Sequence, residues 1–225
     1  MSAYKVASPI TIGFQSLIKA MAHKNKPIIM STGYCTIPEI SRAVETVAQS
    51  DNKQLLLLHC SASYPILSME NVNLSFMKFL ERKYHCLVGF SDHTMSTFIP
   101  AIAVALGARV IEKHFTISRK LKGPDHKFAL EPKELKEMVK NIRDAEKIMG
   151  NKKVIFPFES KMKKIVMMKL VVARDLSAGE VLASNDIIFR RSPGGIEEFE
   201  LNKIIGKKLV RPLKKMTLIN KKDIK

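Results

Sequence analysis

The first half of the sequence alternates short apolar runs with longer segments of helical periodicity. Within each run the apolar residues are continuous, which is typical of parallel strands that are covered on both faces. The segments between them repeat apolar residues three or four positions apart, which predicts helices that pack on such a sheet. The predicted strands are 4–7, 27–30, 55–58, 88–94 and 110–116, and the predicted helices are 14–22, 37–49, 72–84 and 98–107.

Polar residues close each predicted strand, and two of the tips carry a histidine: Ser91-Asp92-His93 and Glu112-Lys113-His114. In a β/α barrel, catalytic groups lie at the carboxyl ends of the strands. Because a single helix separates these two strands, the rings of His93 and His114 can converge on one divalent metal ion. The alternative for a histidine is an ordinary structural role, which is favoured for His59 at the end of the third strand.

The rest of the sequence predicts a helix, a linker and a second, smaller domain. A polar loop at 117–128 precedes an amphipathic helix over 131–149, and Gly150 suits the carboxyl-terminal cap of that helix. The lysine-rich stretch that follows is expected to be irregular. The predicted division is a first domain at 1–150, a linker at 151–166 and a β-rich domain at 167–225, with strands at 170–173, 187–191, 210–213 and 218–219.

The composition limits what the chain can be. With 46% hydrophobic residues in 225 positions it can bury a core, and it has no apolar run long enough to span a bilayer. Its three cysteines are widely spaced, and its first residues lack a signal-peptide pattern, so we expect reduced thiols in a cytoplasmic protein. The net charge of +17 is explained by solvated lysines, and it would also attract a small anionic substrate. Nucleic-acid binding is not expected, because no arginine-rich or aromatic-interleaved motif is present.

Several sequence motifs occur together in a fixed order. In the first domain they are Lys26–Gly33, Leu57–Cys60, Tyr64-Pro65, Gly89–Thr94, Ala105–Ala108, Ile111–Thr116, Gly123–Lys127 and Leu130–Pro132. In the second domain they are Ala178–Glu180, Arg191 with Pro193–Ile196, and Ile205–Lys208. The first set resembles the sialic acid synthase (N-acetylneuraminate synthase) family. The second set resembles the antifreeze-like (SAF) domain at the carboxyl terminus of its members.

This resemblance implies an α/β fold in which a (β/α)8 TIM barrel is followed by the SAF domain. It implies an enzyme that condenses phosphoenolpyruvate with an N-acylmannosamine-type sugar to give a nine-carbon 2-keto sugar acid and phosphate. It also implies a divalent metal, Mn²⁺ in the first place, with Mg²⁺ and Co²⁺ as alternatives. The expected assembly is a homodimer in which the SAF domain covers the active site of the neighbouring subunit.

The resemblance also assigns roles to residues around the metal. His93 and His114 are expected to be its ligands, and Asp92 to support an imidazole ring as a third catalytic residue. The residues expected to bind substrate are Ser8, Ser31, Ser91, Lys113, Tyr64, Asp125 and Arg191. The alternative for Asp92 is an ordinary loop cap, and the alternative for Lys113 is a salt bridge.

Within this set, the resemblance separates three parts of the substrates. Ser31 and Ser91 are expected at the phosphate, although a plain turn is an equal alternative for Ser31. Tyr64 and Asp125 are expected at the sugar. Arg191 is expected to reach the N-acyl group in the neighbouring subunit's site, and its alternative is a surface position in a basic module.

One departure from the family pattern bears on activity. The strand at 4–7 matches the fourth barrel strand, so the sequence is expected to carry strands four to eight without the first three. After Ser8 the acidic residue common in the family is also missing, and Ala62 stands where some relatives have a polar side chain. Three hypotheses remain: half of a split synthase that pairs with a separate N-terminal barrel fragment, a non-catalytic sugar-binding or interaction remnant, or part of a longer sequence.

Overall fold

The computed structural model describes residues 2–66 and 68–225, which fold as two compact units. The first unit runs to Asn151, and the second extends from Lys152 to Lys225. Within the described residues, none of the helices combines the length and the apolar character needed to cross a membrane.

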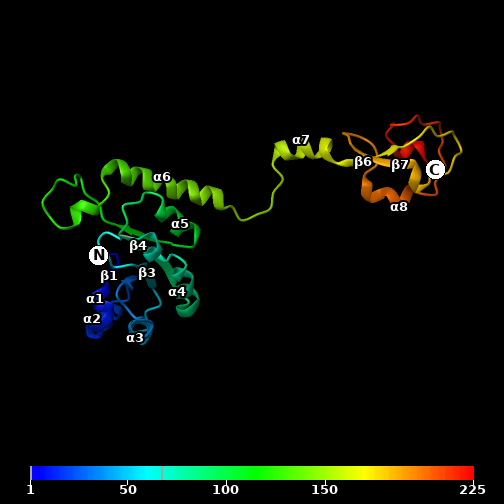
Figure 1. Ribbon diagram of the computed structural model, residues 1–225. Helices are drawn as coiled ribbons and strands as arrows, with labels where there is room; N and C mark the ends of the chain where they lie inside the picture. Colours follow the sequence, from blue (N-terminus) through cyan, green and yellow to red (C-terminus); the bar gives the residue numbers. More distant parts are fainter. Residues whose placement is uncertain (1, 67) are drawn as a thin grey trace. The chain divides into compact units, whose positions relative to one another are not determined.

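Five parallel strands form the sheet of the first unit, in the order β1-β2-β3-β4-β5. Figure 1 labels β1, β3 and β4 of this sheet, near the helices α1 to α4. Each strand pairs with the next one along the chain, which is how a β/α barrel is assembled. The strands are β1 (Tyr4–Val6), β2 (Ile28–Ser31), β3 (Leu55–Cys60), β4 (Leu87–Asp92) and β5 (Ile111–Lys113). The predicted α/β fold is therefore confirmed as a curled half-barrel of five strands.

Helices connect these strands, and most lie where the periodicity predicts them. The helices are α1 (Ser8–Gly13), α2 (Gln15–Ala22), α3 (Ile37–Ala48), α4 (Phe76–Tyr84), α5 (Ile99–Ala105) and α6 (Pro132–Met149), with 3₁₀ turns η1 (Met69–Val72) and η2 (Asp125–Phe128). The single helix expected over 72–84 begins later, because Asn73 adopts a left-handed conformation with φ of 43°. Helix α1 was not predicted; Pro9 suits its first turn, and the Thr11 hydroxyl donates to the Ser31 carbonyl at 2.8 Å.

The two faces of the sheet have different neighbours because side chains alternate along each strand. One face packs on the helices, and its core includes Val6, Ile28, Met30, Leu57, Val88 and Phe90 from the strands. His59 belongs to this face: it is 5% exposed, and its Nε2 donates to the Val72 carbonyl at 2.8 Å. His59 therefore has the structural role that the sequence favours. The residues between these core positions turn toward the concave face, where the site lies.

The second unit is built around the antiparallel strands β6 (Met168–Val172) and β7 (Ile187–Arg191). Its remaining elements are α7 (Pro157–Val166), η3 (Ser184–Asp186), η4 (Glu198–Glu200), α8 (Leu201–Ile204) and η5 (Lys221–Asp223). The strands predicted at 210–213 and 218–219 are wrong, since these segments make only isolated bridges from Leu213 and Leu218. Their apolar residues are nevertheless in the core, because Leu213 and Ile219 are buried.

The stretch expected to be irregular contains α7. Pro157 suits the first helical turn, and the Glu159 carboxylate accepts the backbone N–H of Phe156 at 2.8 Å, which satisfies one free donor of that turn. No residue of α7 is buried. The lysines that indicated a linker are therefore compatible with a helix, because they point to solvent along an exposed surface.

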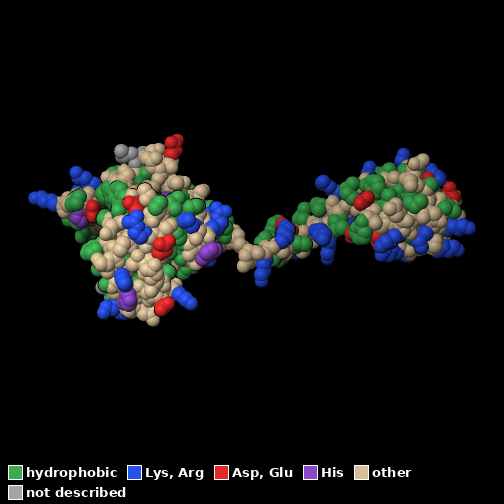
Figure 2. Space-filling view, turned by 90° about the horizontal axis from the view of Figure 1, so that it is seen from below, with side chains coloured by type: hydrophobic (Ala, Val, Ile, Leu, Met, Phe, Trp, Pro, Cys, Tyr) green, Lys and Arg blue, Asp and Glu red, His purple; other side chains and the backbone are tan. Residues whose placement is uncertain are grey.

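Basic side chains are spread over the molecule. Residues 152–225 carry 18 Lys and Arg against 8 Asp and Glu. On the face seen in Figure 2, the Lys and Arg side chains are scattered over both units and interspersed with other residue types. On this face the distribution is typical of solvated lysines.

Candidate active site

Two histidines stand at the carboxyl ends of adjacent strands. Asp92 pairs with Lys113 as the last register pair of β4 and β5, so His93 and His114 follow at the same level. The centroids of the two rings are 5.4 Å apart. The His93 side chain is buried, whereas that of His114 is 31% exposed. The structure thus brings the two expected metal ligands together at one edge of the sheet.

Aromatic rings border this histidine pair. Tyr64 lies 4.1 Å from the His93 ring and 5.9 Å from the His114 ring, measured between centroids. Phe128 lies 4.9 Å from the His114 ring and 5.6 Å from the Tyr64 ring. Tyr64 is 49% exposed, so part of its side chain is accessible to a ligand. The position expected to contact the sugar is therefore next to the histidines.

Each imidazole has a neighbour at its Nδ1 atom. The His93 Nδ1 lies 3.1 Å from the Ser61 carbonyl oxygen, and the His114 Nδ1 lies 3.8 Å from the Asp125 carboxylate. Burial lowers the pKa of His93 below its usual value. A neutral ring is the form that a metal requires, so the environment of His93 suits a ligand.

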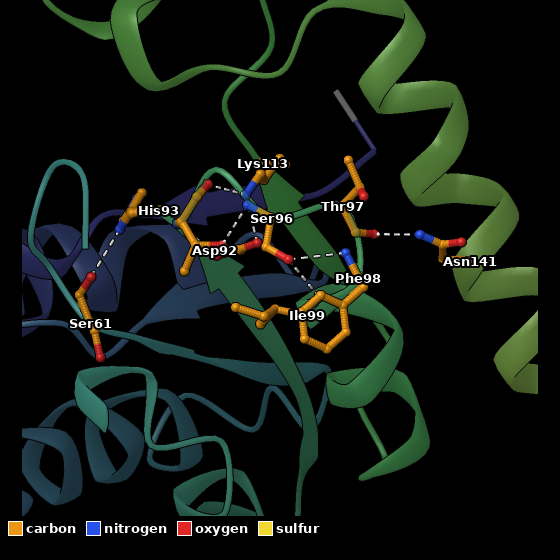
Figure 3. Close-up of polar contacts among 10 residues, drawn as sticks. Ser61, Asp92, His93, Ser96, Thr97, Phe98, Ile99, Lys113 and Asn141 are labelled. Carbon is orange, nitrogen blue, oxygen red and sulfur yellow. Dashed lines mark hydrogen bonds and ion pairs between the residues drawn. The ribbon is translucent and has the colours of Figure 1, made fainter. Parts of the chain in front are cut away.

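Asp92 and Lys113 form an ion pair with each other (Figure 3). The Lys113 Nζ lies 2.6 Å from the Asp92 carboxylate and also donates to the Thr94 carbonyl, while the Thr94 N–H donates to Asp92 at 2.8 Å. The two side chains are 4% and 0% exposed. Burial lowers the pKa of Lys113, although the Asp92 charge opposes this shift.

This geometry contains the salt bridge that the sequence offers as the alternative for Lys113. The support of an imidazole by Asp92 and the binding of substrate by Lys113 stay predictions. Strand alternation explains the ion pair, because Phe90, Asp92 and Lys113 share the face that packs on the helices, while Ser91 and Glu112 point to the concave face. The buried ion pair therefore joins the two strand tips that carry the histidines.

Hydrogen bonds also fix the loop that follows β4 (Figure 3). The Ser96 hydroxyl accepts the backbone N–H groups of Phe98 and Ile99 at 3.1 and 3.2 Å, which satisfies donors at the start of α5. The Asn141 side chain on α6 donates to the Thr97 carbonyl at 3.2 Å. The segment between His93 and α5 is thus tied to two helices.

A polar network that includes one residue missed by the sequence analysis lies on the concave face. The Lys5 Nζ donates to the Ser31 hydroxyl at 2.8 Å and lies 3.4 Å from Glu112. The Ser91 hydroxyl donates to the other oxygen of Glu112 at 2.7 Å. Lys5 stands on β1 and Glu112 on β5, so this ion pair spans the sheet from one edge strand to the other. Alternation along the strand could have identified Lys5, because its neighbour Val6 points into the core and Lys5 must therefore point to the concave face.

Small residues pack closely together beside this polar network. A Cβ added to Gly33 would lie 3.0 Å from each of the Ser8 hydroxyl, the Cys60 sulfur and the Ala62 Cβ. Ser8 and Ser31 are buried. The structure therefore places both serines, which we expected to bind substrate, close to the concave face. Thr32 is directed elsewhere, because its hydroxyl donates to the Leu58 carbonyl at 2.9 Å.

Arg191 ends β7 in the second unit, and its side chain is exposed. Its expected contact with an N-acyl group belongs to an assembly of two subunits and stays a prediction. Within its own unit, Arg191 lies on the surface, which is the alternative that the sequence offers.

The histidine pair could supply two of the ligands of a divalent metal ion such as Mn²⁺, Mg²⁺ or Co²⁺, but not a full coordination shell. Neutral imidazole nitrogens bind Mn²⁺ and Co²⁺, which also accept water and substrate oxygens, whereas Mg²⁺ prefers oxygen ligands. Within residues 2–66 and 68–225, no cluster of three or more His, Cys, Asp or Glu side chains is arranged to hold a metal. Two protein ligands would therefore leave most of the coordination shell to water or to substrate.

Comparison with known proteins gives relatives along both units. Over 193 residues the chain is 39% identical to the N,N'-diacetyllegionaminic acid synthase of Legionella pneumophila, covering 84% of this chain and 54% of the relative. It is 32% identical over 206 residues to the pseudaminic acid synthase of Campylobacter jejuni, covering 92% and 60%. The crystal structure of N-acetylneuraminic acid (sialic acid) synthetase from Leptospira borgpetersenii in complex with citrate superposes with a TM-score of 0.64 at 36% identity, covering 73% and 56%.

Family models match both units in the order that the motifs indicate. The chain spans 54–61% of the length of the first curated relatives that it matches. The SAF domain model matches residues 169–225. The NeuB family model matches residues 1–154, which is more than half of the chain. With its parallel half-barrel and its histidine pair, the chain therefore belongs to the NeuB family of sialic acid synthase relatives and carries a SAF domain after the barrel strands.

Proposed function

We propose that this chain forms the carboxyl-terminal part of a sialic-acid-type synthase. The reaction is the condensation of phosphoenolpyruvate with an N-acylmannosamine-type sugar to a nine-carbon 2-keto sugar acid, with release of phosphate. The observation that carries the proposal is the pair of imidazoles, 5.4 Å apart, above a concave face that holds Lys5, Ser31 and Ser91. This arrangement offers donors for an anion next to a place for a metal.

The concave network suits the anionic substrate. Lys5 supplies a positive charge, and the hydroxyls of Ser31 and Ser91 supply two neutral donors, which together match a phosphate or carboxylate group. Glu112 holds these groups in the absence of substrate by accepting from Ser91 and pairing with Lys5. The overall positive charge favours the approach of a small anion.

The histidine pair and its neighbours suit the sugar. When bound, a divalent metal would supply Lewis-acid polarisation of an aldehyde oxygen. His93 and His114 would hold it, and Tyr64 and Asp125 would orient the sugar beside them. Arg191 would bind the N-acyl group from the partner subunit of a homodimer. Positioning of the two substrates would supply much of the rate enhancement.

The half-barrel leaves strand edges that further strands would pair. Both β1 and β5 have a strand neighbour on one side only within the described residues. At the amino ends of β2, β3 and β4 lies a cavity of about 1090 Å³ that is lined by Pro27, Leu55 and Leu87, among others. Leu87 is 56% exposed there. Because a closed barrel covers its edges and its interior, we propose that activity requires three further β/α units that complete the barrel, on a separate fragment or on a longer chain.

A complementation assay tests this proposal. We expect no phosphate release from phosphoenolpyruvate, N-acetylmannosamine and Mn²⁺ with the 225-residue chain alone. We expect release when a fragment with the first three β/α units of a relative is added. The control is the same fragment with the matching half of its own protein. Sugar binding without turnover in a complemented assembly would instead support the non-catalytic alternative.

Lys5 offers a more specific prediction in the active assembly. Replacement of Lys5 by Met should raise the KM for phosphoenolpyruvate by about 10- to 100-fold, since one charge-assisted hydrogen bond is lost. The KM for the sugar should change little. Lys24→Met removes an exposed lysine outside the network and serves as the matched control. An equal rise in both KM values would contradict the assignment of Lys5 to the phosphate.

A further inference from the structure

The hydrogen bond of His93 determines which of its ring nitrogens carries the proton. The Ser61 carbonyl oxygen can only accept, and it lies 3.1 Å from Nδ1 (Figure 3). Nδ1 must therefore be the N–H donor. In a neutral imidazole the other nitrogen is then an acceptor, so the lone pair is on Nε2.

Cys60 supports the same edge of the ring. It pairs with Ser91 in the sheet register, and its sulfur lies 3.8 Å from the His93 Nδ1. The thiol is itself held in place, because the Gly33 backbone approaches so closely that a Cβ there would lie 3.0 Å from the sulfur. Cys60 is 8% exposed. The buried Cys60 thiol thus lies between Gly33 and the His93 imidazole.

His114 has a charged neighbour in the corresponding position. The Asp125 carboxylate, at the start of η2, lies 3.8 Å from the His114 Nδ1. The backbone of His114 is fixed independently, since its carbonyl accepts the Leu130 N–H at 3.0 Å. A carboxylate near Nδ1 favours a proton on that atom. Across the described residues, neither Nε2 atom of the pair has a hydrogen-bond partner.

We propose that Ser61, Cys60 and Asp125 form a shell that holds both imidazoles in the Nδ1–H tautomer and so reserves the two Nε2 atoms for a ligand. Cys60 and Asp125 are then positioning residues of the histidine pair. This adds to Asp125 a role besides its expected contact with the sugar. The tautomer assignment stands on the geometry alone, and its importance for metal binding rests on the proposed function.

Imidazole ¹⁵N chemical shifts of the metal-free chain test the tautomers directly. We expect the Nδ1–H form for both rings at a pH where they are neutral. Asp125→Ala should convert His114 to a mixture of tautomers, and Asp125→Asn should largely restore the Nδ1–H form, because its amide oxygen keeps a partial negative charge beside Nδ1. His23, which lies outside the site, provides an internal reference in each spectrum. A wild-type His93 in the Nε2–H form would overturn the proposal.

Titration with Co²⁺, followed by visible absorption, tests the consequence for binding. Cys60→Ala should weaken Co²⁺ binding about tenfold, the lower end of the range for residues that support a metal ligand. Cys60→Ser should recover most of the affinity, and Cys86→Ala, which removes a half-buried thiol at the other end of β4, should leave it unchanged. No sulfur-to-cobalt charge-transfer band should appear, because the thiol supports the ring and does not bind the ion.

The two measurements separate the two ideas. One outcome is that the wild type binds neither Co²⁺ nor Mn²⁺ but shows Nδ1–H tautomers that respond to Asp125→Ala. The metal part of the proposed function then fails, whereas the proposed shell around the imidazoles is supported. If Co²⁺ binds and Cys60→Ala and Asp125→Ala change neither the tautomers nor the affinity, the shell is overturned. A charge-transfer band in the wild type would make Cys60 a ligand and would equally overturn its positioning role.

Discussion

Replacement of His114 by Ala should abolish metal-dependent phosphate release in an active assembly, with a loss of about 1000-fold or more in kcat/KM. The pair supplies the only two imidazoles that meet at the strand tips within the described residues, with centroids 5.4 Å apart. If the pair holds a metal as proposed, loss of one ligand would remove Lewis-acid stabilisation worth several kcal/mol, and about 4 kcal/mol corresponds to three orders of magnitude in rate. Activity and Mn²⁺ affinity should be measured on the same preparation.

The control for His114→Ala is His23→Ala. His23 is exposed at the end of α2, and its Nδ1 contacts the Lys19 carbonyl of its own helix. The control should leave phosphate release and Mn²⁺ affinity unchanged. Circular dichroism should show that both variants retain the fold. Unchanged turnover in a folded His114→Ala assembly would remove this residue from the metal site.

Replacement of Lys113 by Ala should destabilise the first unit by about 3–5 kcal/mol, because it leaves the buried Asp92 charge without its partner. The Lys113 and Asp92 side chains are 4% and 0% exposed, and the Lys113 Nζ also donates to the Thr94 carbonyl. The free energy of unfolding can be obtained from urea titrations monitored by circular dichroism. The same variant should weaken Mn²⁺ binding, since the ion pair joins the two strand tips.

The chain contains a matched ion pair for comparison. On α6 the Lys140 Nζ lies 2.8 Å from an Asp144 carboxylate oxygen, but the two side chains are 73% and 42% exposed. Exposed pairs of this spacing contribute little, so Lys140→Ala should leave the unfolding curve unchanged. If Lys113→Ala were as mild as Lys140→Ala, the first pair would be dispensable for stability. Lys113 would then again be available for the substrate role that the sequence indicated.

The sequence determined the architecture of the first unit because apolar periodicity is a local property. Continuous apolar runs such as 27–30 and 55–58 and helical repeats such as 37–49 correspond to β2, β3 and α3. It also determined the level of His93 and His114, since parallel strands end at one edge of a sheet. The motifs around them identified the family that the comparisons confirm.

The tertiary structure decided which side each polar residue faces. Glu112 and Lys113 are neighbours in the sequence, but alternation points the first to the concave face and the second into the core beside Asp92. Lys5 and Glu112 are 107 positions apart, and only the curvature of the sheet brings their edge strands within reach of a 3.4 Å ion pair. The contacts of Ser61 and Cys60 with His93 likewise depend on the packing of β3 against β4. Spacing along the chain fixes the strands and the level of their tips, whereas partners across the sheet depend on curvature and register, which a local pattern does not encode.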